Sequence, residues 1–331
     1  MAQDQWHPGR LLEVSGSYWR TCALHAGVKL GIFTTIGEDR VTASAVAKKL
    51  GTDEDGTTRL LDALTAMALL SKKDGHYLNT PMSRTYLSKD SDRYIGYMIR
   101  HHHHLMESWS RLDEAVTSGQ PISARNPIKE EDRREDFLMG MFNTASQMAP
   151  TLVTEFDLSG RRHLLDLGGG PGTYAIHFCR QNPQLRATVF DLPTTRPFAE
   201  KTNARFNLTV RIDFIPGNYV DEEIAGSYDI VWMSHILHSE GPETVGQLFK
   251  KVAAILEPDG MIMVHDFILA DTMDGPLFPA LFSLNMLVRT QSGRSYSQNQ
   301  ITAMLAEAGF KSIQRQSYRG PTESGVITGM I

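Results

Sequence analysis

The sequence predicts an α/β protein in which a mainly helical region precedes a parallel, doubly wound sheet. Residues 11–150 place apolar side chains mostly at helical spacing, whereas from about residue 160 short apolar segments alternate with helical ones. A glycine-rich turn follows the first of these apolar segments, at the edge where such sheets bind ligands. A chain of 331 residues is long enough for two domains.

The first region predicts a helix, a turn, a second helix and a two-stranded wing. We expect helices over 18–36, 42–51 and 57–70 and a hairpin over 70–78. Gly51 ends the middle helix, and Asp74-Gly75 forms the turn of the hairpin. Such a winged-helix pattern serves either DNA binding or protein packing and dimerisation. The acidic residues at 53–55 would repel phosphate, so we favour the protein contact.

Two further helices are expected over 94–119 and 135–148. Four consecutive histidines, His101–His104, lie within the first helix. Because neighbouring positions on a helix point in different directions, they are not a ready set of metal ligands, although one or two could face a ligand crevice. The methionine and aromatic side chains of the second helix are typical of core packing.

The second region predicts short apolar strands separated by helices. The strands are expected over 163–167, 187–190, 211–215, 228–233 and 261–265. The helices are expected over 173–182, 194–205 and 242–256. A helix over 297–309 and two further strands within 311–331 could complete the sheet. This alternation is the signature of a parallel sheet with helices on both faces.

The turn after the first strand reads Asp166-Leu167-Gly168-Gly169-Gly170-Pro171-Gly172. Glycines let the backbone turn tightly and approach a ligand without a Cβ clash. A dinucleotide fingerprint beginning at Gly168 would need glycine at position 173, where Thr173 stands. The acid at position 166 would repel a diphosphate, but it would attract a ligand that carries an amino group and a sulfonium.

Asp191 ends the second predicted strand, where a carboxylate suits hydrogen bonds to ribose hydroxyls. Two acids and three spaced glycines therefore favour S-adenosyl-L-methionine as the ligand over a nicotinamide dinucleotide. The alternative is a tight strand-to-helix turn that binds no ligand.

His238 follows the fourth predicted strand, at the same sheet edge as the glycine-rich turn. A phenol has a pKa near 10, so it benefits from a base as it accepts a methyl group. A histidine, with a pKa near 6.5, suits that task and would contribute roughly 10²–10⁴ in rate. Asp266, at the end of the fifth strand, could fix the histidine tautomer. A metal held by His235, His238 and the His265-Asp266 pair is the alternative.

Charge and composition argue against other classes of function. The net charge of −5 and the pI near 6.2 disfavour general nucleic-acid binding, which is typical of basic proteins. No uncharged apolar run approaches the ~20 residues of a membrane span, and we expect no secretory signal at residues 1–8. The two cysteines, Cys22 and Cys179, form no disulfide framework, so we expect a cytoplasmic protein.

The sequence resembles the two-domain S-adenosyl-L-methionine-dependent O-methyltransferases typified by caffeic acid O-methyltransferase of plants, whose bacterial relatives act on antibiotics, phenazines and pigment precursors. The motifs that carry the resemblance are Leu105-Met106-Glu107-Ser108-Trp109, the glycine-rich turn, Phe190-Asp191-Leu192-Pro193, Gly217-Asn218-Tyr219, His235-Ile236-Leu237-His238 and Gly293-Arg294-Ser295-Tyr296-Ser297. The resemblance covers nearly the whole chain. It implies a winged-helix-like dimerisation domain over 1–100, a helical connector over 101–155 that lines the substrate pocket, and a Rossmann-like class I methyltransferase domain over 156–331. It also implies a homodimer.

The resemblance further implies roles for individual residues. Cofactor binding falls to Asp166, Gly168, Gly169 and Gly170 for the methionine part, Asp191 for the ribose, and Leu192, Asn218, Tyr219 and Ser234 for further contacts. The catalytic base falls on His238, with Asp266 in support. The small-molecule methyl acceptor would meet Leu138, Phe142, His235 and Asn285.

The sequence departs from the plant-type pattern in four ways, and these departures concern the acceptor more than the cofactor. His238 is followed by Ser239-Glu240 instead of Asp-Trp, Asn218 replaces an aspartate, Ser295 replaces a second glutamate, and His235 is an additional imidazole. The leading hypothesis is O-methylation of a small phenolic or enolic molecule. A C- or N-methyltransferase, with or without a metal, and a winged-helix regulator that senses the cofactor are the alternatives.

Overall fold

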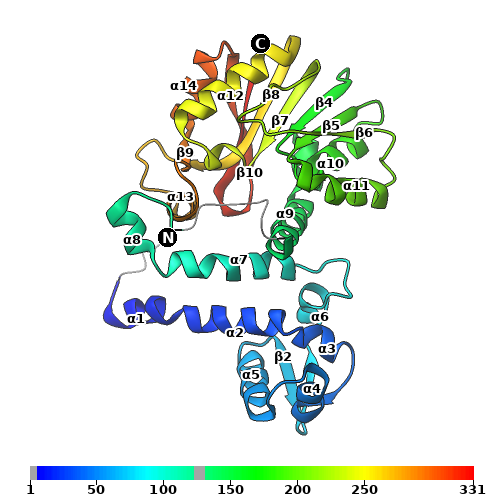
Figure 1. The fold of residues 1–331 in the computed structure, drawn as a ribbon, viewed down its shortest axis with the longest axis vertical. Helices are drawn as coiled ribbons and strands as arrows, with labels where there is room; N and C mark the ends of the chain where they lie inside the picture. Colours follow the sequence, from blue (N-terminus) through cyan, green and yellow to red (C-terminus); the bar gives the residue numbers. More distant parts are fainter. Residues whose placement is uncertain (1–5, 123–130) are drawn as a thin grey trace. The chain divides into compact units, whose positions relative to one another are not determined.

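A computed structural model describes residues 6–122 and 131–331 of the chain. The chain divides into two compact units, Met1–His104 and Leu105–Ile331, which are described separately (Figure 1). Among the described residues, none of the helices is long and apolar enough to cross a membrane.

The first unit is mainly helical and carries a small antiparallel sheet. Its elements are α1 (Pro8–Gly16), α2 (Tyr18–Lys29), α3 (Ile32–Ile36), β1 (Val41–Thr42), α4 (Ala43–Leu50), α5 (Glu54–Ala66), β2 (Leu70–Lys73), β3 (His76–Asn79), α6 (Pro81–Leu87) and the first part of α7 (Gly96–Trp109). The sheet order is β1-β3-β2. The predicted pair of helices and two-stranded wing are present. Thr42 caps α4 by accepting a hydrogen bond from the Ala45 amide, and Gly51 ends that helix with a positive φ.

The second unit is a mixed, mostly parallel sheet with helices on both faces. Its helical elements are α8 (Leu112–Ser118), α9 (Glu131–Leu152), η1 (Val153–Glu155), α10 (Thr173–Gln181), η2 (Pro193–Thr195), α11 (Arg196–Arg205), η3 (Leu237–Ser239), α12 (Pro242–Ile255), α13 (Leu277–Arg289), α14 (Gln298–Glu307) and η4 (Pro321–Glu323). Its strands are β4 (His163–Leu167), β5 (Arg186–Asp191), β6 (Ile212–Pro216), β7 (Tyr228–Ser234), β8 (Leu256–Leu269), β9 (Tyr296–Ser297), β10 (Lys311–Arg319) and β11 (Ser324–Met330).

The strand order is β10-β11-β8-β7-β4-β5-β6, and β9 pairs with β8 outside this path. Strands β4 to β8 run parallel, whereas β11 is antiparallel to β8. The register sets Leu167 of β4 beside Phe190 of β5 and Met233 of β7. The carboxyl ends of these strands therefore meet at one edge, where sheets of this kind bind ligands.

Buried side chains form separate clusters on the two faces of this sheet. On one face, Leu165 and Leu167 pack with residues of α12 and α14. On the other face, Leu164 packs with residues of α9 and α10 (Figure 1). Because the sheet is buried on both faces, its strands are nearly continuous apolar runs in the sequence.

The prediction of one helix over 94–119 was wrong, because the chain leaves helical geometry between α7 and α8. Arg111 has φ −118° and ψ 26°, and its amide closes a turn on the Ser108 carbonyl. The Arg111 guanidinium pairs with Glu114 of the new helix at 2.7 Å. The apolar periodicity continues through this break, so it did not reveal the turn.

Candidate active site

The glycine-rich turn joins β4 to α10 at the carboxyl edge of the sheet. Gly168 and Gly170 have φ values of +67° and +55°, which glycine adopts at little cost. A Cβ at Gly169 would lie 2.5 Å from the carboxyl carbon of Asp166. The turn therefore packs directly onto the Asp166 side chain, and only glycine fits at position 169.

Asp166 is fully buried beneath this turn. One carboxyl oxygen accepts a hydrogen bond from the Ala175 amide at 3.1 Å, and the other has no hydrogen-bond partner among the described residues. Burial raises the pKa of Asp166 to about 7, and the nearby charge of Asp191 adds to that rise. An unpartnered carboxyl oxygen in this position suits a cationic ligand group such as an amino group.

Asp191 ends β5 beside the turn, and three protein donors hold its carboxylate. Its oxygens accept hydrogen bonds from the Gly170 amide at 2.8 Å, the Leu192 amide at 2.7 Å and the Thr195 hydroxyl at 2.9 Å. The side chain is thus fixed in place at the sheet edge.

Asn218 and Tyr219 follow β6 and lie in a tight loop. The Asn218 amide nitrogen donates to Asp221 at 2.6 Å, and its oxygen accepts from the Val220 amide at 3.0 Å. The Tyr219 ring approaches Gly168, because a Cβ at that glycine would lie 3.5 Å from the ring. Tyr219 therefore borders the glycine-rich turn, while Asn218 shapes the loop that presents it.

His238 lies in η3, just after β7, and pairs with Asp266 of β8. Its Nδ1 is 2.7 Å from Asp266 Oδ1. The two residues are 7% and 3% exposed, so water screens the pair little. Burial alone would raise the pKa of Asp266, but His238 and His235 outweigh it and hold that pKa below its usual range. The ionised carboxylate can accept a hydrogen bond from Nδ1–H of His238, and in that tautomer the lone pair is on Nε2.

Aromatic rings line the His238 imidazole. Its centroid is 4.7 Å from that of Phe282, on α13, and 5.9 Å from that of Phe267, which stacks on it. The Phe267 and Phe282 centroids are 4.6 Å apart. The sequence analysis missed both residues. Phe282 was missed because no helix was assigned over 277–289, where only the apolar run could have indicated one, and Phe267 lies in β8 with no local signal that its ring contacts His238.

His235 and Ser234 lie beside the His238–Asp266 pair. His235 Nδ1 is 3.5 Å from Asp266 Oδ1. Ser234 Oγ is 2.9 Å from His265 Nδ1, and His265 Nε2 is 3.1 Å from Ser324 Oγ. Burial lowers the pKa of His265 well below 6.5, and His235 nearby adds to that effect. His265 is therefore a neutral bridge that orients the Ser234 hydroxyl, a role that the sequence did not reveal.

The remaining predicted acceptor residues lie on α9 and α13. Leu138 and Phe142 are each 5% exposed, and the Phe142 ring lies 6.4 Å from that of Phe206. The Trp109 indole donates a hydrogen bond to Asn285 Oδ1 at 2.8 Å. These contacts place Phe142 beside Phe206 and Asn285 beside Trp109, and their roles toward an acceptor stay predictions.

The sheet order, the glycine-rich turn and the carboxylates at the strand ends together define a class of protein, the S-adenosyl-L-methionine-dependent methyltransferases. A family model described as the O-methyltransferase domain matches residues 113–311, and a model of the O-methyltransferase dimerisation domain matches residues 12–89. The chain therefore belongs to the O-methyltransferase family, and S-adenosyl-L-methionine is its cofactor.

Individual relatives agree with this assignment over almost their whole length. The chain is 31% identical to a 3-hydroxy-5-methyl-1-naphthoate 3-O-methyltransferase of Streptomyces sahachiroi, over 98% of this chain and 95% of the relative. It is 29% identical to the N,N-dimethyltransferase OxyT of Streptomyces rimosus, over 91% of this chain and 90% of the relative. Its fold matches the crystal structure of human N-acetylserotonin methyltransferase in complex with SAM, with a TM-score of 0.88 and 26% identity. The match covers 100% of this chain and 99% of the human chain.

Proposed function

We propose that this enzyme transfers a methyl group from S-adenosyl-L-methionine to the hydroxyl of a small phenolic or enolic aromatic molecule, with His238 as the general base. The observation that carries the proposal is the buried His238–Asp266 pair, with 2.7 Å between Nδ1 and Oδ1, beside Phe267 and Phe282.

The cofactor-binding residues suit the chemical groups of S-adenosyl-L-methionine, which supplies an electrophilic methyl group on a cationic sulfur. Asp166, whose second carboxyl oxygen has no hydrogen-bond partner among the described residues, and the glycine-rich turn would hold the positive methionine part. Asp191 would hold the ribose hydroxyls, while Leu192, Asn218, Tyr219 and Ser234 would supply the remaining contacts. Residues that hold the cofactor in this way would bring the acceptor and the methyl group together, and such proximity contributes much of the rate.

The His238 imidazole takes the acceptor's proton at Nε2 as the oxygen–carbon bond forms. Asp266 stabilises the resulting imidazolium, because a charge-assisted hydrogen bond is stronger when both partners are charged. The base is needed because a phenol with a pKa near 10 is mostly protonated at neutral pH. We assign roughly 10²–10⁴ in rate to this proton transfer.

The aromatic surroundings of His238 support an aromatic acceptor. Phe267 and Phe282 offer ring faces and edges against which a flat molecule can pack. Leu138, Phe142, His235 and Asn285 are the further acceptor contacts that we propose. The naphthoate and acetylserotonin named for relatives of this chain are aromatic molecules, which agrees with this choice.

Amine methylation is the second candidate, because one relative is an N,N-dimethyltransferase. An amine acceptor needs its nitrogen unprotonated, and His238 could receive that proton too. The discriminating experiment offers the enzyme matched phenols, enols and anilines together with methyl-labelled S-adenosyl-L-methionine. Label on the phenol or enol oxygen supports the proposal, and label on nitrogen or carbon alone overturns it.

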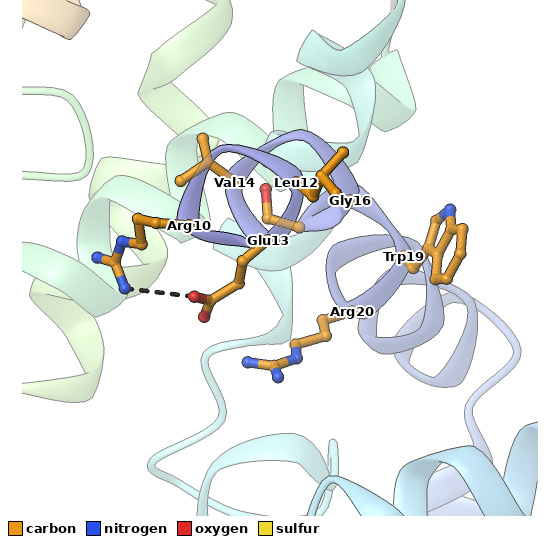
Figure 2. A pocket seen from close by; sticks show the side chains of 8 residues that line it. Arg10, Leu12, Glu13, Val14, Gly16, Trp19 and Arg20 are labelled. Carbon is orange, nitrogen blue, oxygen red and sulfur yellow. Dashed lines mark hydrogen bonds and ion pairs between the residues drawn. The ribbon is translucent and has the colours of Figure 1, made fainter. Parts of the chain in front are cut away.

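For the assembly, we propose a homodimer that forms through the first unit. Leu11, Leu12, Val14, Tyr18 and Trp19 are at least half exposed on α1 and α2, and Figure 2 shows a hollow there that Leu12, Val14 and Trp19 help to line. A second chain would cover these side chains. We also propose the division into a dimerisation domain over 1–100, a helical connector over 101–155 and a methyltransferase domain over 156–331. A cytoplasmic location is a further part of the proposal.

A further inference from the structure

Two imidazoles face a single buried carboxylate in this enzyme. Asp266 Oδ1 lies 2.7 Å from His238 Nδ1 and 3.5 Å from His235 Nδ1. One nitrogen of each histidine and one Asp266 oxygen lie within 4.8 Å of one another. The proposed reaction needs only the His238–Asp266 pair, so His235 is left without a function in proton transfer.

The two distances from Asp266 to the imidazoles are near those found around a tetrahedral metal ion. Two ligand atoms, each ~2.1 Å from zinc, are about 3.4 Å apart when they subtend a tetrahedral angle. The distances of 2.7 and 3.5 Å from Asp266 Oδ1 bracket that value. Two histidines and one carboxylate also form a donor set that zinc and other divalent transition metals accept.

The backbone and burial of His235 direct its imidazole toward this cluster. Its φ is +56°, which is uncommon for a residue other than glycine, and its amide donates to the His265 carbonyl at 2.8 Å. Within the described ranges, its Nδ1 is buried and has no hydrogen-bond partner. The side chain is 20% exposed, which leaves a path for an ion and for a water in a fourth position. His265 is already engaged by Ser234 and Ser324, so it is not the fourth ligand.

We propose that His235, His238 and Asp266 form a site for a divalent transition metal such as Zn²⁺, and that metal binding switches off His238 as a base. The inhibitory part rests on the proposed function. In the metal-free enzyme, His238 carries its proton on Nδ1 and accepts another at Nε2. In the metal-bound enzyme, the metal takes the Nδ1 lone pair, and the proton moves to Nε2. As the metal binds Nδ1, the Nδ1–H bond breaks and an N–H bond forms at Nε2, so the imidazole stays neutral and Nε2 can no longer accept a proton.

Cobalt binding tests the site directly. The full-length enzyme, purified without a histidine tag and freed of metal by a chelator, is titrated with Co²⁺, whose tetrahedral complexes absorb visible light. We expect one Co²⁺ per chain, displaced by Zn²⁺. His235→Phe removes one ligand and replaces it with a ring that can pack against Phe267. It should weaken Co²⁺ binding by at least ~100-fold. Unchanged Co²⁺ affinity in this variant would overturn the site.

The histidine run at 101–104 provides the matched control. A variant with glutamine at all four positions should keep the cobalt spectrum, because none of the four belongs to the proposed site. Loss of the spectrum there, with retention in His235→Phe, would place the metal at the run and overturn the proposal. If His235→Phe fails to fold, Asp266→Asn removes another ligand with little change in shape and should weaken Co²⁺ binding as much.

Turnover assays separate this proposal from the proposed function. Zn²⁺ should inhibit the wild-type enzyme, and a chelator should restore its full turnover. The residual turnover of His238→Ala should not respond to Zn²⁺, because the base is already absent. Bound Zn²⁺ with full wild-type turnover would overturn the switch. The base itself is judged in chelated buffer, where a loss of turnover in His238→Ala supports the proposed function whatever the metal result.

Discussion

Replacement of Asp166 by asparagine is expected to stabilise the protein at high pH and to weaken cofactor binding. Asp166 is fully buried, and burial raises its pKa to about 7, whereas the unfolded chain has a value near 3.8. The folded protein therefore binds more protons than the unfolded chain between these two values. Stability from this group is fully present at low pH and is lost as the pH rises toward 7.

The expected magnitude follows from the size of this shift. Between pH 5 and pH 8, the wild type loses stability mainly over the two pH units below the folded-state pKa of about 7. Each pH unit is worth 1.36 kcal/mol, so its free energy of unfolding falls by about 3 kcal/mol. Asparagine has no charge to lose, and its oxygen can still accept from the Ala175 amide. Relative to wild type, the free energy of unfolding of Asp166→Asn should therefore rise by about 3 kcal/mol between the two pH values.

Urea unfolding of both proteins at pH 5 and pH 8 measures this difference, because the titration of groups that do not interact with Asp166 cancels between them. An identical pH dependence in the two proteins would refute the reasoning. The same substitution removes a charge-assisted contact to the cofactor that is worth roughly 1.5–3 kcal/mol. Calorimetry at pH 8 should then show S-adenosyl-L-methionine bound about 10- to 100-fold more weakly.

Three further predictions concern the cofactor edge and the first unit. Asp191→Ala should weaken S-adenosyl-L-methionine binding by at least ~10-fold in calorimetry, since it removes the ribose partner and an acceptor for the Gly170 amide; unchanged affinity would remove Asp191 from the site. Gly169→Ala should lower the free energy of unfolding by roughly 1–3 kcal/mol in urea, because its Cβ would meet the Asp166 carboxyl at 2.5 Å; wild-type stability would contradict the tight turn. Duplex DNA should show no salt-dependent binding, because Asp53, Glu54 and Asp55 begin α5; such binding in a mobility-shift titration would revive the regulator hypothesis.

Local signals predicted much of the second unit. The strands β4 to β8 were expected because each contains a short apolar run bounded by glycine, proline or aspartate. The structure confirms β4 to β7 with small shifts of their ends, whereas β8 spans Leu256–Leu269 and is much longer than the predicted 261–265. The glycine-rich turn was visible because a tight strand-to-helix turn requires glycine at particular positions. The pairing of His238 with Asp266 could be expected because His238 follows β7 and Asp266 lies near the carboxyl end of the neighbouring β8.

Other features depend on contacts between distant segments, which local patterns do not carry. The helix α13 lies in an almost uniformly apolar segment, so its periodicity is weak, and the aromatic wall that it supplies through Phe282 was missed. The bridge from Ser234 through His265 to Ser324 requires the register of β8 with β11, which the sequence alone does not fix. The positive φ of His235 likewise becomes visible only in the folded chain.

The central claim, that His238 acts as the general base, is tested most directly by comparing acceptors of different acidity. Single-turnover rates of wild type and His238→Ala are measured at pH 7.5, in chelated buffer with saturating cofactor, for two ring-substituted phenols of similar shape. For a phenol with a pKa near 10, the variant should be slower by roughly 10²–10⁴. For a phenol with a pKa near 7, which is already largely ionised, the two rates should agree within about threefold. Equal losses for both phenols would contradict the base assignment.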